Sequence, residues 1–147
     1  MPEEQTLERA REDAREGKSP STQAGEFVRE EIHHVREGKH GASSPKQAIA
    51  IGLSKARRAG IKLAPPKGSI TLRKKAEQDE KAGQHPHRRV SKKRSRATEG
   101  ALKREPRKSA SHESLSRQAK SSARKRGTTA RRKAAEKAAR TRRARSS

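Results

Sequence analysis

The sequence predicts an all-α protein with a small two-helix hairpin and a long, basic tail that is disordered or conditionally helical. Composition is the first reason: 26% of the 147 residues are apolar and Phe27 is the single aromatic, whereas ordinary domains are roughly 45–50% apolar. The second is that large apolar side chains concentrate between Ser19 and Pro66. A chain of this kind cannot bury enough apolar surface to offset ordering entropy over its whole length.

Charge divides the chain unevenly. The net charge is +23. Residues 1–40 hold 7 Lys or Arg and 10 Asp or Glu, whereas residues 41–147 hold 33 and 7. Such an asymmetry is typical of a basic interaction tail. We therefore expect three segments: an acidic N-terminal helix or extension over 1–18, a helical hairpin over 19–66, and a basic low-complexity tail over 67–147.

Each helix of the hairpin has recognisable ends. The first begins with Ser19 as cap and Pro20 at its first position and ends at Gly38. The second begins at Ser44-Pro45 and ends at Gly60. Apolar residues recur every three or four positions in both, which predicts one buried stripe each. These stripes are Ala24, Phe27, Val28, Ile32 and Val35 in the first, and Ala48, Ile49, Gly52, Leu53 and Ala56 in the second.

Two features of the hairpin leave alternatives open. Gly52 marks a close approach of the two helices, or it merely weakens the second helix. A hairpin of about 45 residues is also small for independent stability, which favours a homodimer or docking on a larger partner. Outside the hairpin, 1–18 has only Leu7 to pack. The tail offers a short helix over 70–81 and an Ala/Arg/Lys-rich stretch over 130–144 that becomes helical when phosphates neutralise it.

The basic residues are the candidate functional groups, because Lys and Arg that contact phosphates release condensed counterions. Single-strand and RNA modules stack bases on aromatic rings. Because Phe27 is the single aromatic residue of this chain, duplex DNA is favoured over RNA. Backbone contact is favoured over base readout, because a hairpin with a long loop matches a helix-turn-helix poorly. The candidate nucleic-acid-binding residues are Lys46, Lys55, Arg57, Arg58, Lys62, Arg88, Arg89, Lys92, Lys93, Arg94, Arg124, Lys125, Arg126, Arg131, Arg132, Lys133, Arg142 and Arg143.

Other chemistry finds little support in the sequence. There is no cysteine, and the six histidines follow no zinc motif, although Glu30 and His34 are four residues apart and His85 and His87 are close. We expect exposed histidines, no metal, no cofactor and no enzymatic activity, because a chain without a core lacks a cleft for acid–base catalysis. No apolar run reaches the ~18 residues of a membrane helix. The expected location is cytoplasmic, at the nucleoid.

The stretch from Glu26 to Ala42, followed by KQAIAIGLSKARRAG over 46–60, resembles an uncharacterised bacterial domain family. Some look-alikes carry labels such as DNA-binding or plasmid-stabilisation protein. The resemblance covers about residues 12–66 and implies a bacterial source and a small basic helical domain, without a mechanism. Look-alikes are expected to have a basic residue where this chain has Ser43, which puts one phosphate contact in doubt.

Three hypotheses follow. The first is a nucleoid-associated or plasmid-maintenance protein that binds duplex DNA through its phosphates. The second is an RNA- or ribosome-associated protein with the same basic tail. The third is an adaptor whose acidic first 40 residues bind the tail or another protein and so regulate its availability.

Overall fold

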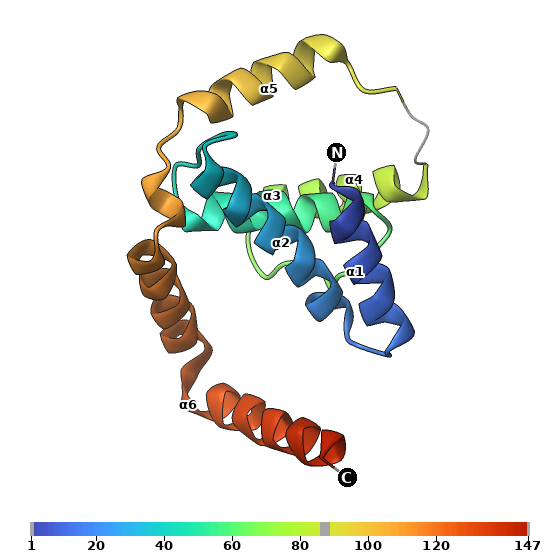
Figure 1. Ribbon diagram of the computed structural model, residues 1–147, viewed down its shortest axis with the longest axis vertical. Coiled ribbons are helices and arrows are strands. Elements are labelled where there is room, and N and C mark those ends of the chain that lie inside the picture. The colour runs from blue at the N-terminus through green and yellow to red at the C-terminus, as the bar shows by residue number, and fades with distance from the viewer. Residues whose placement is uncertain (1, 86–88, 147) are drawn as a thin grey trace. The chain divides into compact units, whose positions relative to one another are not determined.

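The computed structural model describes residues 2–85 and 89–146, and every regular element in them is helical. Figure 1 shows their course. The elements are α1 (Glu4–Arg15), α2 (Pro20–Glu37), α3 (Pro45–Arg58), α4 (Ile70–Gln84), α5 (Lys92–Arg104), the 3-10 turn η1 (Lys108–Ala110) and α6 (His112–Arg145). The chain divides into two compact units, here called unit 1 (up to Ser111) and unit 2 (from His112 onward).

The predicted all-α class holds, but a two-helix hairpin with an intrinsically disordered, histone-like tail is wrong. The described residues form six α-helices, and three of these lie in the segment 67–147 that the sequence predicts as tail. Local sequence explains part of the difference: the hydroxyls of Ser69 and Ser91 accept bonds from Leu72 and Arg94 amides and so cap α4 and α5. Tertiary packing explains the rest, because α4 and η1 return to the hairpin.

The ends of α2 and α3 lie where the sequence predicts them. Ser19 and Ser44 cap the two helices, each followed by proline at the first helical position. Gly38 adopts φ 80°, and the Lys39 amide bonds to the His34 carbonyl 3.0 Å away. The Gln47 Oε1 atom accepts from the Ser43 amide at 2.6 Å, which holds the residue before the cap against the first turn of α3.

Gly52 marks a close approach of α2 and α3, which resolves the alternative left open above. A Cβ atom at Gly52 would lie 2.6 Å from the Cα atom of Val28. Two helices can approach this closely only where one presents no side chain. The crossing lies at the centre of unit 1, where α2 and α3 pack on one another (Figure 1).

The core of unit 1 is small and rich in alanine. One cluster joins Ala10, Ala24, Phe27 and Ala56, with Leu7, Leu53, Ile61 and Leu63 packed against it. A second joins Val35, Ala42, Ala48 and Ala110, with Ile32. Both predicted stripes contribute, but α1 and η1 contribute as well. Neighbouring parts of the same chain therefore cover the hairpin, and its small size no longer argues for a partner subunit.

A buried carboxylate joins α4 to α3. Asp79 is only 2% exposed and accepts from the Ser54 hydroxyl at 2.7 Å and the Arg58 Nε atom at 2.8 Å. Lys75, one turn earlier in α4, lies 3.1 Å away. Burial works to raise the pKa of Asp79, but the hydrogen bonds from Ser54, Arg58 and Lys75 outweigh it and leave the pKa below its ordinary value. The negative charge of Asp79 is thus balanced by the cations of Arg58 and Lys75.

The segment around η1 closes the other end of unit 1. The Arg107 guanidinium donates to the carbonyls of Val35 and Arg36 in the last turn of α2, where unpaired carbonyls favour a cation. In return, Arg36 Nε donates to the Ala110 carbonyl at 2.9 Å, and Ala110 is 1% exposed. Residues more than 70 positions apart thereby become part of one fold.

Candidate polyanion-binding surface

α6 is the strongest candidate for binding a polyanion. It holds thirteen Lys or Arg residues and two Glu. None of its residues is buried. A helix with so little apolar surface gains little from packing. All thirteen cations are exposed, so a partner of opposite charge can contact them.

Gly127 divides α6 into two straight parts. Its φ of 79° and ψ of 170° are not helical, and this region of backbone space is nearly restricted to glycine. Figure 1 shows the change of direction at this point within unit 2. The part before Gly127 is about 22 Å long and the part after it about 27 Å, at 1.5 Å per residue. The second part carries eight of the thirteen cations.

The predicted cations of the basic runs lie at the surface. α5 has no buried residue, and its single acid, Glu99, lies 3.0 Å from Lys103, which lowers the Glu99 pKa. Arg88 lies outside the described residues. The others are exposed, namely Arg89, Lys92, Lys93, Arg94, Arg124, Lys125, Arg126, Arg131, Arg132, Lys133, Arg142 and Arg143.

The predicted cations of α3 are placed differently. Lys46 and Lys62 are exposed. Lys55 instead bonds to Glu31, Arg57 is 9% exposed and donates to the Ala64 carbonyl, and Arg58 bonds to Asp79. These three groups hold unit 1 together. Sequence reasoning assigned all three to a ligand because the acidic partners of Lys55 and Arg58 lie 24 and 21 positions away, and the partner of Arg57 is a backbone carbonyl.

Several acidic residues among the first 40 also have partners inside unit 1. Glu3 contacts Lys39 and His34, Asp13 contacts Lys18 at 2.7 Å, and Glu26 lies 3.9 Å from Arg9. The hydrogen bond from His34, followed by that from Lys39, lowers the pKa of Glu3. The Glu3–Lys39 pair is exposed and contributes little stability. The contacts nevertheless reduce the acidic charge that is available to mask a basic helix.

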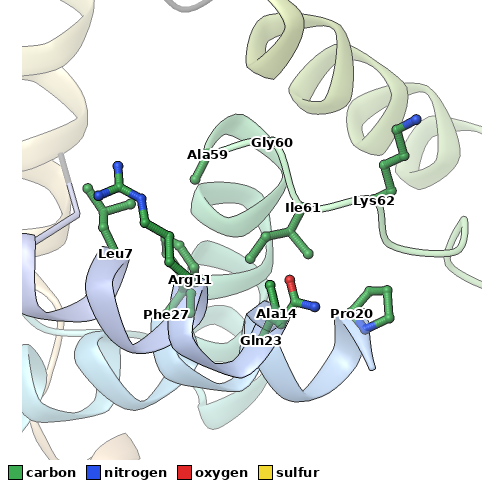
Figure 2. A pocket seen from close by; sticks show the side chains of 11 residues that line it. Leu7, Arg11, Ala14, Pro20, Gln23, Phe27, Ala59, Gly60, Ile61 and Lys62 are labelled. Carbon is green, nitrogen blue, oxygen red and sulfur yellow. The ribbon is translucent and has the colours of Figure 1, made fainter. Parts of the chain in front are cut away.

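A pocket of about 220 Å³ lies where α1, the start of α2 and the turn after α3 meet (Figure 2). Leu7, Phe27 and Ile61 provide apolar walls, and Arg11 and Lys62 provide its cations. Its lining among the described residues contains no carboxylate, histidine or hydroxyl.

The sequence did not predict a cluster of buried polar groups at the C-terminal end of α2. Glu30 and Glu31 are 5% and 0% exposed, and the side chains of His34 and His40 are 12% and 13% exposed. The expectation of exposed histidines is therefore wrong for these two. His33, His85 and His112 are exposed, and His87 lies outside the described residues. The three-residue spacing of Glu31 and His34 in the sequence was a weak signal of this cluster. Only the fold brings His40 and Lys55 beside them.

Residues 17–68 match the model of a family of unknown function (DUF6496). The match contains all of α2 and α3, and it agrees with the resemblance to an uncharacterised domain family. No curated protein and no solved structure matches the chain. In the described part of the chain, no helix has both the length and the apolar character to cross a membrane.

Proposed function

We propose that this protein is a non-enzymatic, nucleoid-associated DNA-binding protein that uses α6 to bind the phosphates of duplex DNA with little sequence preference. The observation that carries the proposal is the charge of α6, with thirteen cations, two acids and no buried residue. The location that follows is the cytoplasmic nucleoid.

The dimensions of α6 suit a duplex groove. An α-helix with side chains is about 10–12 Å across, and the major groove of B-DNA is about 12 Å wide. Phosphates border a helix in this groove on both sides, so cations on several faces of the helix are useful, as in the basic regions of zipper proteins. The chain contains no Asn, and Gln118 of α6 bonds to Ser122, which favours contacts to phosphates over readout of bases.

The internal ion pairs of unit 1 argue against self-masking by the acidic N-terminal segment. Glu3, Asp13, Glu30 and Glu31 each contact a cation of unit 1. The adaptor hypothesis needs free acidic side chains in the first 40 residues, and fewer of them are therefore available than the sequence suggests.

The test is a salt titration of duplex binding by fluorescence anisotropy, with the full-length chain. Substituting Gln for Arg131, Arg132 and Lys133 should reduce the slope of log affinity against log salt by about 2–3, since each phosphate contact contributes about 0.9. The matched control removes the same charge from unit 1 at Lys67, Arg73 and Lys74, which are exposed. It should change the slope by less than about 1.

Two results would contradict the proposal. Equal effects of the two triple variants would mean that net charge, and not α6, determines binding. Tight binding to structured RNA beside weak binding to DNA would assign the same surface to RNA, which is the second hypothesis.

A further inference from the structure

Three potential metal ligands meet at the C-terminal end of α2. Glu31 and His34 lie one turn apart on this helix, and His40 follows the turn at Gly38. One ligand atom from each residue lies within 4.8 Å of the others.

His40 directs an unprotonated nitrogen at Glu31 when its ring is neutral. Its Nδ1 atom lies 2.9 Å from the Gly41 carbonyl oxygen. A carbonyl only accepts, so Nδ1 carries the proton and Nε2 carries a lone pair. That Nε2 atom lies 3.1 Å from Glu31 Oε2. Two lone pairs at this distance repel each other unless a proton or a metal cation lies between them.

His34 repeats the pattern from the other side. Its Nε2 atom lies 3.0 Å from Glu3 Oε1, and Nε2 is the donor of this bond because an ionised carboxylate only accepts. The Nδ1 atom then carries the lone pair and lies 3.8 Å from Glu31 Oε1. Histidines that bind metals almost always donate their outer N–H to a carboxylate or a backbone carbonyl. Glu3 and Gly41 provide one partner of each kind.

Glu31 is the buried centre of the group. Its side chain is 1% exposed, and its Oε2 atom has no hydrogen-bond partner. A buried carboxylate oxygen without a partner is costly. Its Oε1 atom bonds to the Lys55 ammonium, so Lys55 supplies one positive charge to the group.

We infer that Glu31, His34 and His40 form a binding site for one divalent transition-metal ion of the zinc class. Two imidazoles and a carboxylate are donors that suit Zn²⁺ and its neighbours better than Mg²⁺ or Ca²⁺. Zinc bonds of about 2.0–2.2 Å place tetrahedral ligand atoms roughly 3.4 Å apart. The two imidazoles approach different oxygens of Glu31, His40 Nε2 at 3.1 Å from Oε2 and His34 Nδ1 at 3.8 Å from Oε1, and both distances are close to that value.

A groove of about 290 Å³ between α1 and α2 reaches one of the three ligands, because His34 lines it together with Glu3 and Glu30. Glu31 and His40 are not part of its lining. Water can thus approach the group from the side of His34.

Lys55 is the group that must move. Its Nζ atom lies 3.7 Å from Glu30 Oε1, which is buried and has no hydrogen-bond partner. When the ion binds, Lys55 transfers from Glu31 to Glu30, and both carboxylates keep a cation. The ion and the ammonium compete for Glu31, so removal of the ammonium should strengthen metal binding.

The experiment is a titration of the untagged full-length protein with Co²⁺ and then Zn²⁺ near neutral pH. We expect one Co²⁺ per chain, with visible absorption bands of low-coordinate cobalt that Zn²⁺ abolishes. In the unsubstituted chain, bound Co²⁺ should shift the NMR signals of the His34 and His40 rings but not those of His112. This readout requires no variant to fold.

Variants locate the site. His34→Ala and His40→Ala should each lose more than the ~10–100-fold in affinity that loss of an outer partner costs, whereas Glu3→Gln should fall within that range. Lys55→Gln should bind the ion more tightly than the unsubstituted chain. His33→Ala is the matched control, because His33 is an exposed neighbour on the same helix. It should bind like the unsubstituted chain, and circular dichroism confirms that each variant is folded.

Absence of 1:1 binding, or equal losses in the His33 and His34 variants, would overturn the inference and leave Glu31, His40 and Lys55 as a structural ion-pair cluster. Unshifted His34 and His40 signals beside bound Co²⁺ would place the ion elsewhere and overturn it too. Because the DNA assay is independent of this site, either proposal can fail alone.

Discussion

Gly52 and Gly25 lie in neighbouring helices but in opposite environments. A Cβ atom on Gly52 would meet the backbone of Val28, whereas a Cβ atom on Gly25 would have nothing within 4 Å. Gly52→Ala should therefore destabilise unit 1 by about 1–3 kcal/mol through overpacking. Gly25→Ala should stabilise it by about 0.5–1 kcal/mol, because alanine is the better helix former.

Urea unfolding followed by circular dichroism measures both changes. The pair serves as its own control, since both variants add one methyl group to a helix. Two changes of the same sign would show that α2 and α3 do not approach closely at Gly52.

Buried carboxylates are the residues that the sequence placed incorrectly. Helical periodicity assigned Glu30 to the polar side of α2, yet Glu30 and Glu31 are buried. Periodicity detects one apolar stripe, and it cannot indicate that α1 and the loop after Gly38 cover a second face. The same limit applies to Asp79, because its partners Ser54 and Arg58 belong to another helix.

At the scale of elements, the ends of helices were predictable and their packing was not. Ser-Pro starts and glycine ends act locally, so the bounds of α2 and α3 follow from a few residues each. α1 was expected to have little to pack. It nevertheless contributes Ala10 and Leu7 to the first core cluster, because small side chains let α1 approach α2.

The two parts of α6 give an element-scale prediction. Alanine at position 127 strongly disfavours the φ of 79° that separates them, so Gly127→Ala should join them into one continuous helix. The helical signal in circular dichroism should then increase. Ala130→Gly is the matched opposite change and should lower the signal. A helical signal that Gly127→Ala leaves unchanged or lowers would mean that Gly127 is not the cause of the break.

At the scale of the whole molecule, the two units should be thermodynamically separable. α6 buries no residue, whereas the two core clusters lie entirely within unit 1. A chain that ends at Ser111 should therefore keep the thermal midpoint of unit 1 to within about 2 °C, which corresponds to less than about 0.5 kcal/mol.

Differential scanning calorimetry of the full chain and of this shorter chain tests that expectation. A large fall in the midpoint would show that unit 2 stabilises unit 1. The division into 1–18, 19–66 and 67–147 remains a prediction about independent folding, which the same measurement on shorter chains can address.

The sequence alone determined the helical class, the bounds of α2 and α3 and the excess of positive charge, because caps, periodicity and composition are properties of residues close in the chain. Only the tertiary structure decided which charged side chains are available to a ligand and which are paired inside the fold. Lys55, Arg57 and Arg58 look like their exposed neighbours until Glu31, Ala64 and Asp79 are placed beside them. The histidine cluster likewise exists only when Glu3, His40 and α2 meet, since a binding site depends on distances that no local pattern contains.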